Sequence, residues 1–404
     1  MIAHAQKLRI GVAGLGRAGA SMLGAMLRHP LVEVTAAADP RREPRDRFEI
    51  DVGGQTFASV EEMVGSPVVD AVYIATPHQF HVENVVTAAN AGKHVICEKP
   101  MALTLTECDT MIEAVERKHV RMVVGHTHSH DPAIREMRRM ITSGEYGRLG
   151  MLNNWAFTDF LYRPRRPEEL DTSLGGGILF NQVPHQVDIA RHLGGGLVRS
   201  VRAYTGVWDR RRRTEAACAA FLDFEDGAAA TLVYNGYDHF DTDELAFWIG
   251  EGGQPKSPRH GATRAGLDPE LTPEAEATLK YATGYGGDNP AARARTAHGA
   301  HQPHFGVLIA SCERADLRPS ADGVLVYADD GVREVPLPPN VGGVPGRGDT
   351  LDELHAAVFF GKPVFHSARW GKATLAVCLA IQQSAREHRE ILVQHQVSNE
   401  GSVS

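Results

Sequence analysis

The stretch LRIGVAGLGRAG, residues 8–19, joins a short apolar run to three glycines spaced Gly-x-Gly-x-x-Gly. The apolar run predicts a buried strand, and residues 18–29 that follow have the periodicity of a helix. In such a strand–turn–helix unit the first glycine permits a tight turn, the second lets a phosphate approach the backbone, and the third lets the helix pack closely. The residues that we expect to line this turn are Gly14, Gly16, Arg17, Ala18 and Gly19.

Short apolar runs continue to alternate with helical patterns over the first part of the chain. Further strands are predicted at 32–39, 70–77, 93–100 and 120–130, and a helix at 104–119 with Thr104 or Thr106 as its N-cap. This alternation is typical of βαβ units and a parallel sheet. We therefore predict an α/β Rossmann domain at residues 6–127.

The pattern changes after Asp131, where closely spaced strands predominate. Strands are predicted at 199–208, 216–237 and 244–250, hairpin turns at 225–227 and within 323–338, and a helix at 373–388. These elements predict an α+β domain at residues 128–395. Residues 250–302, rich in Gly, Pro and Ala, are either a long insertion or a mobile flap, and residues 396–404 are expected to be a disordered tail.

Asp39 ends the second predicted strand, 20 residues after Gly19. A carboxylate at this position holds the adenosine ribose hydroxyls of a dinucleotide, which favours NAD. Arg41 and Arg42 follow directly, and a guanidinium there accommodates the 2′-phosphate of NADP. The sequence thus predicts a dinucleotide site, with NAD favoured and NADP left open.

Two further motifs follow predicted strands. ATPHQFH, residues 75–81, ends one strand and begins a helix, and CEKP, residues 97–100, ends another. Parallel strands present their carboxyl ends at one edge of the sheet, where ligands bind. Lys99 precedes Pro100 in a restricted backbone that aims it at this edge, within reach of a reacting hydroxyl. The alternative is a Pro-initiated helix with surface histidines and a surface Glu–Lys pair.

Three arginines, Arg163, Arg165 and Arg166, lie in the proline-stiffened stretch DFLYRPRRPEELDTSLGGG, residues 159–177. A guanidinium pairs bidentately with a carboxylate, so these side chains suit an acidic substrate. The alternative is that they pair in solvent with the three acidic residues that follow them.

Histidines form two patterns. Asn181, His185 and Asp188 are spaced i, i+4 and i+7, on one face of a predicted helix. The histidines at alternate positions at the end of the 120–130 strand are His126, His128 and His130. Neighbours along one strand face make a poor tetrahedral metal site, so we predict no metal and expect polar contacts with the substrate.

Composition narrows the class of protein. The formal net charge is −8, which argues against a nucleic-acid partner, and no apolar run is long enough to span a bilayer. The five cysteines have no Cys-x-x-Cys spacing, so a disulfide scaffold and a structural zinc site are not expected, and the simplest location is the cytoplasm.

Taken together, the motifs resemble the glucose–fructose oxidoreductase/inositol dehydrogenase (Gfo/Idh/MocA) family. The resemblance rests on Gly-x-Gly-x-x-Gly, Thr-Pro-x-x-x-His, Glu-Lys-Pro and a glycine run followed by His-x-x-Asp, and it covers nearly the whole chain. It implies an α/β Rossmann domain followed by an α+β domain with an open, mainly antiparallel sheet, which binds substrate. It also implies an NAD(P)-dependent dehydrogenase that forms a homo-oligomer, a dimer or a tetramer.

In this family the Lys of Glu-Lys-Pro and the helical His act at a substrate carbinol, which implies catalytic roles for Lys99 and His185. Members that oxidise sugars and inositol often carry Asp where this chain has Asn181. Asn does not accept a proton at neutral pH, so the base is either His185 or Lys99. Many sugar-oxidising relatives also carry an arginine in the stretch where this chain has GHTHSHDP, residues 125–132.

Within the family, FTDFLYRPRRPEELDT (157–172) and the late PHFG and ADLRPSADG stretches look most like the phthalate 4,5-cis-dihydrodiol dehydrogenase branch. This implies oxidation of a carboxylated cis-dihydrodiol to a catechol, with NAD as the cofactor. The alternatives are a sugar or inositol dehydrogenase, which gains nothing from a substrate carboxylate, and a non-catalytic NAD-bound regulator. The intact Lys99 and His185 argue against the regulator.

The predicted site therefore has three groups of residues. The catalytic residues are Lys99 and His185. The cofactor-binding residues are Gly14, Gly16, Arg17, Ala18, Gly19, Asp39, Arg41, Thr76, Pro77, His78, His81, Glu98 and Lys99. The substrate-binding residues are Lys99, His128, Tyr162, Arg163, Arg165, Arg166, Asn181 and His185.

Overall fold

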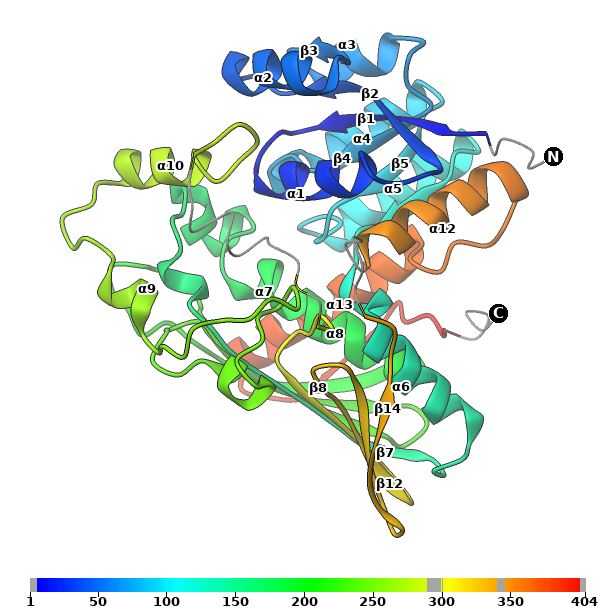
Figure 1. The fold of residues 1–404 in the computed structure, drawn as a ribbon, viewed down its shortest axis with the longest axis vertical. Helices are drawn as coiled ribbons and strands as arrows, with labels where there is room; N and C mark the ends of the chain where they lie inside the picture. Colours follow the sequence, from blue (N-terminus) through cyan, green and yellow to red (C-terminus); the bar gives the residue numbers. More distant parts are fainter. Residues whose placement is uncertain (1–5, 289–298, 300, 340–345, 400–404) are drawn as a thin grey trace. The chain divides into compact units, whose positions relative to one another are not determined.

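The computed structural model describes residues 6–288, 299, 301–339 and 346–399 (Figure 1). The chain forms two compact units. The first consists of Met1–His126, Thr278–Ala294 and Arg347–Lys372, and the second of Thr127–Ala277, Arg295–Gly346 and Ala373–Ser404. Each unit is built on a sheet of its own.

The first unit holds a six-stranded parallel sheet in the order β3-β2-β1-β4-β5-β6. Its strands are β1 (Leu8–Ala13), β2 (Val32–Ala38), β3 (Gln55–Phe57), β4 (Ala71–Ile74), β5 (His94–Cys97) and β6 (Met122–Val124). The intervening helices are α1 (Arg17–Met26), α2 (Arg42–Val52), α3 (Val60–Gly65), α4 (His81–Asn90) and α5 (Leu105–Arg117). The strand order reverses between β1 and β4, and ligands of such sheets bind at the carboxyl ends of the strands at that point. The α/β prediction is confirmed.

Local signals explain these elements. Leu8, Ile10 and Val12 of β1 have no exposed surface, as expected for a parallel strand that is covered on both faces. Helix α5 begins with a capping box, in which the Thr104 side chain accepts from the Glu107 N–H (3.2 Å) and the Glu107 carboxylate accepts from the Thr104 N–H (2.9 Å). Of the two predicted N-caps, Thr104 is therefore the one used.

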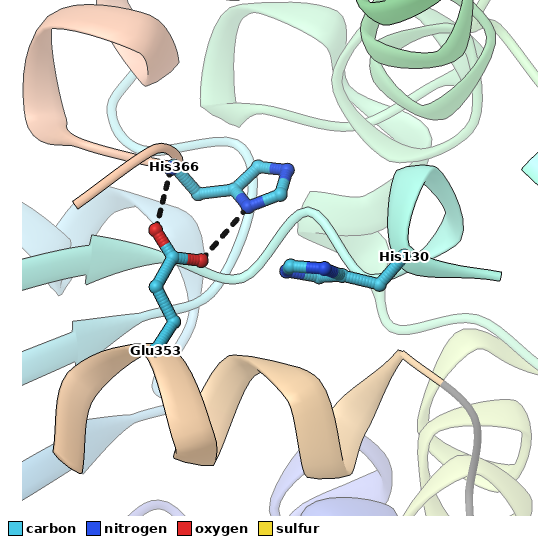
Figure 2. A group of neighbouring side chains, drawn as sticks. All are labelled: His130, Glu353 and His366. Atoms are coloured by element: carbon cyan, nitrogen blue, oxygen red, sulfur yellow. Dashed lines mark hydrogen bonds and ion pairs between the residues drawn. The ribbon is translucent and has the colours of Figure 1, made fainter. Parts of the chain in front are cut away.

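The chain returns to the first unit late in the sequence, through α12 (Arg347–Phe360) and the segment after it. Figure 2 shows how Glu353 of α12 holds that segment: its carboxylate accepts from the His366 backbone N–H (2.7 Å) and lies 3.0 Å from the ring Nδ1. The His366 carbonyl in turn accepts from the Val124 N–H of β6 (2.7 Å). The predicted domain boundaries, 6–127 and 128–395, assigned Arg347–Lys372 to the second domain, whereas these residues belong to the first unit.

The second unit holds a nine-stranded sheet in the order β14-β13-β12-β11-β7-β10-β9-β8-β15. Its strands are β7 (Leu149–Phe157), β8 (Val198–Gly206), β9 (Ala217–Phe224), β10 (Ala229–Asn235), β11 (Val307–Cys312), β12 (Ala315–Pro319), β13 (Gly323–Ala328), β14 (Gly331–Pro336) and β15 (Ile391–Leu392). All neighbours pair antiparallel except β7 and β10, which are parallel. The predicted mainly antiparallel sheet is confirmed.

The other helices are α6 (Pro132–Ser143), α7 (Ile178–Asn181), α8 (Val183–Leu193), α9 (Ala262–Ala265), α10 (Pro273–Tyr281) and α13 (Ala368–Glu387). Both predicted hairpins form: β9 and β10 are joined at Gly227, whose φ is +89°, and β13 pairs with β14. In the region predicted as insertion or flap, the described residues contain α9 and α10, and residues 289–298 and 300 lie outside the described part.

One predicted strand is wrong and another is too long. Residues 244–250 are not extended: the Asp241 carboxylate accepts from the Asp243 N–H (3.0 Å) and starts the 3-10 turn Thr242–Ala246. Phe247 and Trp248 then have positive φ angles of 62° and 55°. The strand predicted at 120–130 ends at Val124, because the following backbone turns and His128–His130 forms a 3-10 turn.

The tail prediction is wrong for residues 396–399, which pack against the second unit. The Asn399 side chain donates to the His192 carbonyl (2.6 Å) and accepts from Arg138 (2.9 Å), and its N–H donates to Gly195 (3.1 Å). Residues 400–404 lie outside the described part. Within the described residues, every helix is too short or too polar to cross a bilayer.

Candidate functional site

The glycine turn after β1 fits a dinucleotide pyrophosphate. Gly14 has a φ of +93°, which only glycine adopts readily. A Cβ on Gly19 would lie 1.9 Å from the Gly14 carbonyl oxygen, so α1 packs on the turn only because Gly19 has none. A Cβ on Gly16 would meet nothing within 4 Å, which leaves open space on the side where a phosphate must approach. Helix α1 begins at Arg17 and has no acidic residue in its first turn, so its N-terminus favours an anion.

Asp39 follows β2 and is almost completely buried. Its carboxylate accepts from the Leu15 N–H (2.9 Å) of the glycine turn and from the N–H, Nε and Nη2 of Arg41 (each 3.0 Å). The Arg41 guanidinium also lies 4.9 Å from the centre of the Tyr281 ring. Arg42, in contrast, is exposed and pairs with Asp46 on α2. Asp39 therefore fixes the glycine turn and lies where the adenosine ribose binds in this fold.

The other predicted cofactor residues also follow strands of this sheet. Thr76, Pro77 and His78 come after β4, and Glu98 and Lys99 come after β5. The Glu98 carboxylate accepts from the Tyr73 hydroxyl (2.6 Å) and from the Lys99 N–H (3.2 Å), which fixes the backbone at Lys99.

His81 differs from the prediction. Its ring has no exposed surface, and its nitrogens lie 2.9 Å from the Pro100 carbonyl oxygen and 3.0 Å from that of Thr76. Burial lowers the pKa of His81, against the two carbonyl oxygens, which favour the protonated ring. A ligand contact needs an exposed ring atom, so we reassign His81 as the residue that links the loop after β4 to the loop bearing Lys99.

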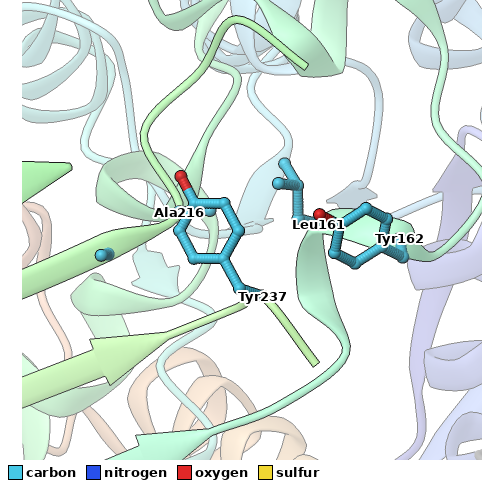
Figure 3. Close-up of a cluster of buried hydrophobic side chains, with 5 residues drawn as sticks. Leu161, Tyr162, Ala216 and Tyr237 are labelled. Carbon is cyan, nitrogen blue, oxygen red and sulfur yellow. The ribbon is translucent and has the colours of Figure 1, made fainter. Parts of the chain in front are cut away.

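In the second unit, the arginine stretch starts from a fixed point. Phe160–Tyr162 forms a 3-10 turn, and Leu161 and Tyr162 are buried against Ala216 and Tyr237 (Figure 3). The Tyr162 hydroxyl donates to Asp209 (3.0 Å), and burial raises the pKa of Tyr162 to about 12. Tyr162, predicted to bind substrate, is thus part of the core that anchors the turn, and we withdraw it from the site.

The three arginines have different environments. Arg165 is buried, donates to the Phe160 carbonyl (2.6 Å) and lies 3.8 Å from the centre of the Phe160 ring, and burial lowers its pKa to about 10. The Nε of Arg166 lies 3.3 Å from the carboxylates of both Glu168 and Glu169. Arg166 therefore matches the alternative prediction, in which the arginines pair with the acidic residues that follow them.

Arg163 keeps its terminal nitrogens available. Its Nε donates to Asp159 (2.7 Å), and among the described residues no acceptor is bonded to its Nη atoms. Burial alone would lower the pKa of Arg163, but the charges of Asp159, Tyr234 and Glu251 raise it further above its ordinary value. The guanidinium therefore remains a cation with its bidentate end unused.

The predicted helix face of Asn181, His185 and Asp188 is wrong in one respect. The helix breaks at Gln182, where ψ is −49° and φ is −121°, so Asn181 ends α7 while His185 and Asp188 lie on α8. Pro184 occupies the first turn of α8, where it needs no N–H bond. The Asn181 amide donates to the carbonyls at both ends of the glycine run, Gly175 (3.2 Å) and Gly177 (2.7 Å), so it shapes that loop.

Gln186 fixes α8, and therefore His185, on the sheet. It is completely buried, and its amide donates to the Asn154 side chain (2.6 Å) of β7 and to the Val233 carbonyl (3.1 Å) of β10. The His185 ring meets the His128 ring edge to face at 4.7 Å and the Phe305 ring at 4.9 Å.

His128 lies between two carboxylates. Its Nδ1 is 2.9 Å from Asp131 and its Nε2 is 3.4 Å from Glu251. Burial alone would lower the pKa of His128, but these two carboxylates raise it to about 9, so the ring is an imidazolium at neutral pH. The three predicted histidines do not share a face, because they do not lie on one strand. His126 belongs to the first unit, with its ring 6.3 Å from that of His366.

Sequence reasoning missed Glu251, which contacts His128, and Phe305, whose ring packs on both His128 and His185. Glu251 lies at the start of the 250–302 region, whose unusual composition marked it as a candidate for function, and Phe305 lies three residues after its end.

The comparisons with known proteins define the class. Residues 8–126 match the model of the GFO/IDH/MocA oxidoreductase family, NAD-binding Rossmann fold, and residues 134–254 match the GFO/IDH/MocA C-terminal domain. The chain is 39% identical over 391 residues to 1-carboxy-3-chloro-3,4-dihydroxycyclohexa-1,5-diene dehydrogenase of Comamonas testosteroni, covering 94% of this chain and 95% of the relative. The chain belongs to the Gfo/Idh/MocA family.

Solved structures agree. A Bordetella bronchiseptica RB50 protein assigned as a dehydrogenase superposes with a TM-score of 0.90 at 49% identity, covering 96% of this chain and 100% of that one. A Bordetella pertussis dehydrogenase in complex with NADH and UDP-GlcNAcA has the same fold, with a TM-score of 0.70 at 22% identity over 96% of this chain and 98% of that one. This protein is an NAD-dependent oxidoreductase of that family.

The glycine turn offers a direct test. In Gly16→Ala the Cβ enters open space at a φ of −70°, so the melting temperature should not change. The methyl group intrudes where the pyrophosphate approaches, so the Kd for NAD should rise about tenfold, the loss expected for one charged hydrogen bond. Calorimetric titration and thermal unfolding measure the two effects. Gly19→Ala is the matched variant: its Cβ meets the Gly14 carbonyl, and it should lower the melting temperature. An unchanged Kd in Gly16→Ala would contradict the placement of the phosphate.

Proposed function

We propose that this dehydrogenase oxidises a cis-dihydrodiol of an aromatic dicarboxylate, of the phthalate 4,5-dihydrodiol type, to the catechol. The observation that carries the proposal is the Arg163 guanidinium, a partly buried cation whose terminal nitrogens bond to no acceptor among the described residues. The negative charge of Glu251 acts on the Arg163 guanidinium. Glu251 also contacts His128, and the His128 ring packs on the His185 ring. A carboxylate on Arg163 would thus lie close to a histidine that the family motif assigns to catalysis.

Arg163 suits this role better than its neighbours for physical reasons. The core around Leu161 fixes the backbone before it, and Pro164 fixes the backbone after it, so little entropy is lost when the guanidinium is ordered. Asp159 holds Nε only, which leaves both terminal nitrogens for the two oxygens of a carboxylate. Arg165 is buried and donates through Nη2 to the Phe160 carbonyl, whereas the Nε of Arg166 lies between two carboxylates, those of Glu168 and Glu169, which offset its charge. The Comamonas testosteroni relative, whose substrate carries one carboxyl group, supports an acidic dihydrodiol.

The chemistry needs a proton acceptor at the hydroxyl that is oxidised. NAD, when bound, supplies the hydride acceptor for the carbinol carbon. We propose that Lys99 and His185 hold and remove the hydroxyl proton, as their family motifs imply. Two carbonyl contacts of His81 and the Glu98 carboxylate fix the loop of Lys99, and Gln186 fixes α8 under His185. Loss of the proton and hydride gives an enone that tautomerises to a catechol, and aromatisation makes the oxidation favourable.

Both proton-transfer residues can be tested by substitution. Lys99→Ala and His185→Ala should each lower kcat, the first by about a hundredfold or more, the usual range for general acid–base groups. NAD titrations should show that both variants still bind the cofactor, so that the loss of kcat reports on proton transfer at the substrate. His192→Ala, on the same helix as His185 but two turns away, is the matched control and should keep kcat. Near wild-type turnover in Lys99→Ala or His185→Ala would remove that residue from the mechanism.

The carboxylate anchor can be tested with two substrates. Arg163→Ala should lower kcat/KM on a dicarboxylate dihydrodiol by about tenfold to a hundredfold, since a charged bidentate contact contributes about 1.5–3 kcal/mol. On a dihydrodiol without carboxylates the same variant should lose little. Arg163→Lys keeps the charge without the fork and should recover only part of the loss.

Arg166→Ala is the control for this experiment. The partly exposed Arg166 side chain pairs with Glu168 and Glu169, and ion pairs open to solvent contribute about 0–1 kcal/mol, so the variant should be nearly silent on both substrates. Equal losses of Arg163→Ala on both substrates, or no loss on either, would return Arg163 to a structural role. Activity on neutral polyols with no advantage for carboxylates would favour the sugar or inositol dehydrogenase.

We also propose that the chain forms a homo-oligomer through one face of its second sheet. Trp155, Val233, Ala219 and Tyr204 lie opposite one another in a row across β7, β10, β9 and β8. Trp155 and Tyr204 are 42% and 52% exposed, which is unusual for large aromatic side chains in a sheet and suits contact with a second copy. Light scattering of the purified chain gives the mass, and a monomer would contradict the proposal.

A further inference from the structure

A short segment that begins at the last residue of α10 packs on the glycine turn of the first unit. We define this strap as Tyr281–Gly287. The Tyr285 N–H donates to the Leu15 carbonyl (3.0 Å), in the middle of the Gly-x-Gly-x-x-Gly turn. A Cβ on Gly284 would lie 3.0 Å from the Leu15 carbonyl oxygen and 3.5 Å from the Gly16 Cα. The backbone of the strap therefore lies directly against the turn that holds the pyrophosphate.

The strap is held at its far end by α2. The Tyr285 hydroxyl donates to Asp51 (3.0 Å), and its ring meets the buried Phe48 ring edge to face at 6.4 Å. Gly286 has a φ of +75°, and a Cβ placed on it would lie 3.1 Å from the Cγ of Arg47. These contacts involve Arg47, Phe48 and Asp51 of α2, so the strap is fixed relative to the first sheet.

The near end of the strap reaches the adenosine side of the site. The Tyr281 ring lies over the Arg41 guanidinium, and Arg41 grips the Asp39 carboxylate that marks the ribose position. Tyr281 is nevertheless 47% exposed, so much of its ring is open to a ligand. An exposed aromatic face beside the ribose-binding carboxylate is a surface on which a purine stacks.

We propose that the strap Tyr281–Gly287 is part of the NAD site and retains the adenosine half of the cofactor, with the Tyr281 ring as its adenosine-binding side chain. The strap acts in two ways. It restrains the glycine turn through the Leu15 carbonyl, and it adds an aromatic surface that the Gly-x-Gly-x-x-Gly and Asp39 motifs do not supply. Cofactor retention is then shared between the N-terminal motifs and a segment found more than two hundred residues later in the chain.

Binding measurements without any substrate test this proposal separately from the proposed function. Tyr281→Ala should raise the Kd for NAD about fivefold or more, the lower range for stacking of a base on an aromatic ring. It should raise the Kd for ADP-ribose by the same factor, because ADP-ribose contains the adenosine half and lacks nicotinamide. Tyr281→Phe keeps the ring and should bind both ligands like the wild type.

Leu279→Ala is the matched control, since Leu279 is an exposed residue of the same helix and should leave both Kd values unchanged. Unchanged affinity in Tyr281→Ala would overturn the proposal. Tighter binding in that variant would overturn it as well, because the strap would then compete with the cofactor. A change for NAD without one for ADP-ribose would place the effect at the nicotinamide half and contradict an adenosine-binding strap.

Discussion

The close approach of Gly19 to the Gly14 carbonyl oxygen is the constraint on which the first unit depends. A Cβ at Gly19 would lie 1.9 Å from that oxygen, so any other residue pushes α1 away from β1. With the helix seated, its N-terminus faces the turn, and the Leu15 N–H reaches the Asp39 carboxylate after β2. The predicted phosphate and ribose sites thus depend on one backbone contact and one buried carboxylate, and the strap at Leu15 bonds to the same turn.

Buried polar contacts have the corresponding role in the second unit. Gln186 holds α8 on β7 and β10, which fixes His185 on a rigid element. Two carboxylates keep His128 as an imidazolium, and its ring packs edge to face with the His185 ring. Glu251 links His128 to Arg163, because it contacts the His128 ring and its charge acts on the Arg163 guanidinium.

Local signals explain why the fold could be predicted. Glycine spacing, alternation, the Thr104 capping box and the Gly227 turn are all encoded within a few residues, and each element they mark is present. The errors arise where a side chain bonds to the backbone of a nearby turn or loop, as the Asp241 carboxylate does at the turn that replaces a predicted strand. The Asn181 amide bonds to carbonyls of the glycine run, and the short helix α7 ends at Asn181, a break that spacing alone did not indicate.

Motifs could likewise mark several site residues, but they could not show the environment of each side chain. The sequence marked His81, but the motif does not reveal that its ring faces two carbonyls inside the unit. It marked three arginines alike, whereas a core turn and an acid at Asp159 distinguish Arg163 from the others. Tyr281 and Glu251 had no motif, since their roles arise from where a poorly patterned region packs.

The central claim is that a substrate carboxylate directs this NAD-dependent enzyme to a dihydrodiol. The most direct measurement compares kcat/KM of the wild-type protein for NAD reduction with three substrates: a dicarboxylate cis-dihydrodiol, the same ring without carboxylates, and myo-inositol. The account predicts that the dicarboxylate exceeds both others by at least about tenfold, the value of one charged bidentate contact. Equal efficiency with and without carboxylates, or a preference for inositol, would contradict it.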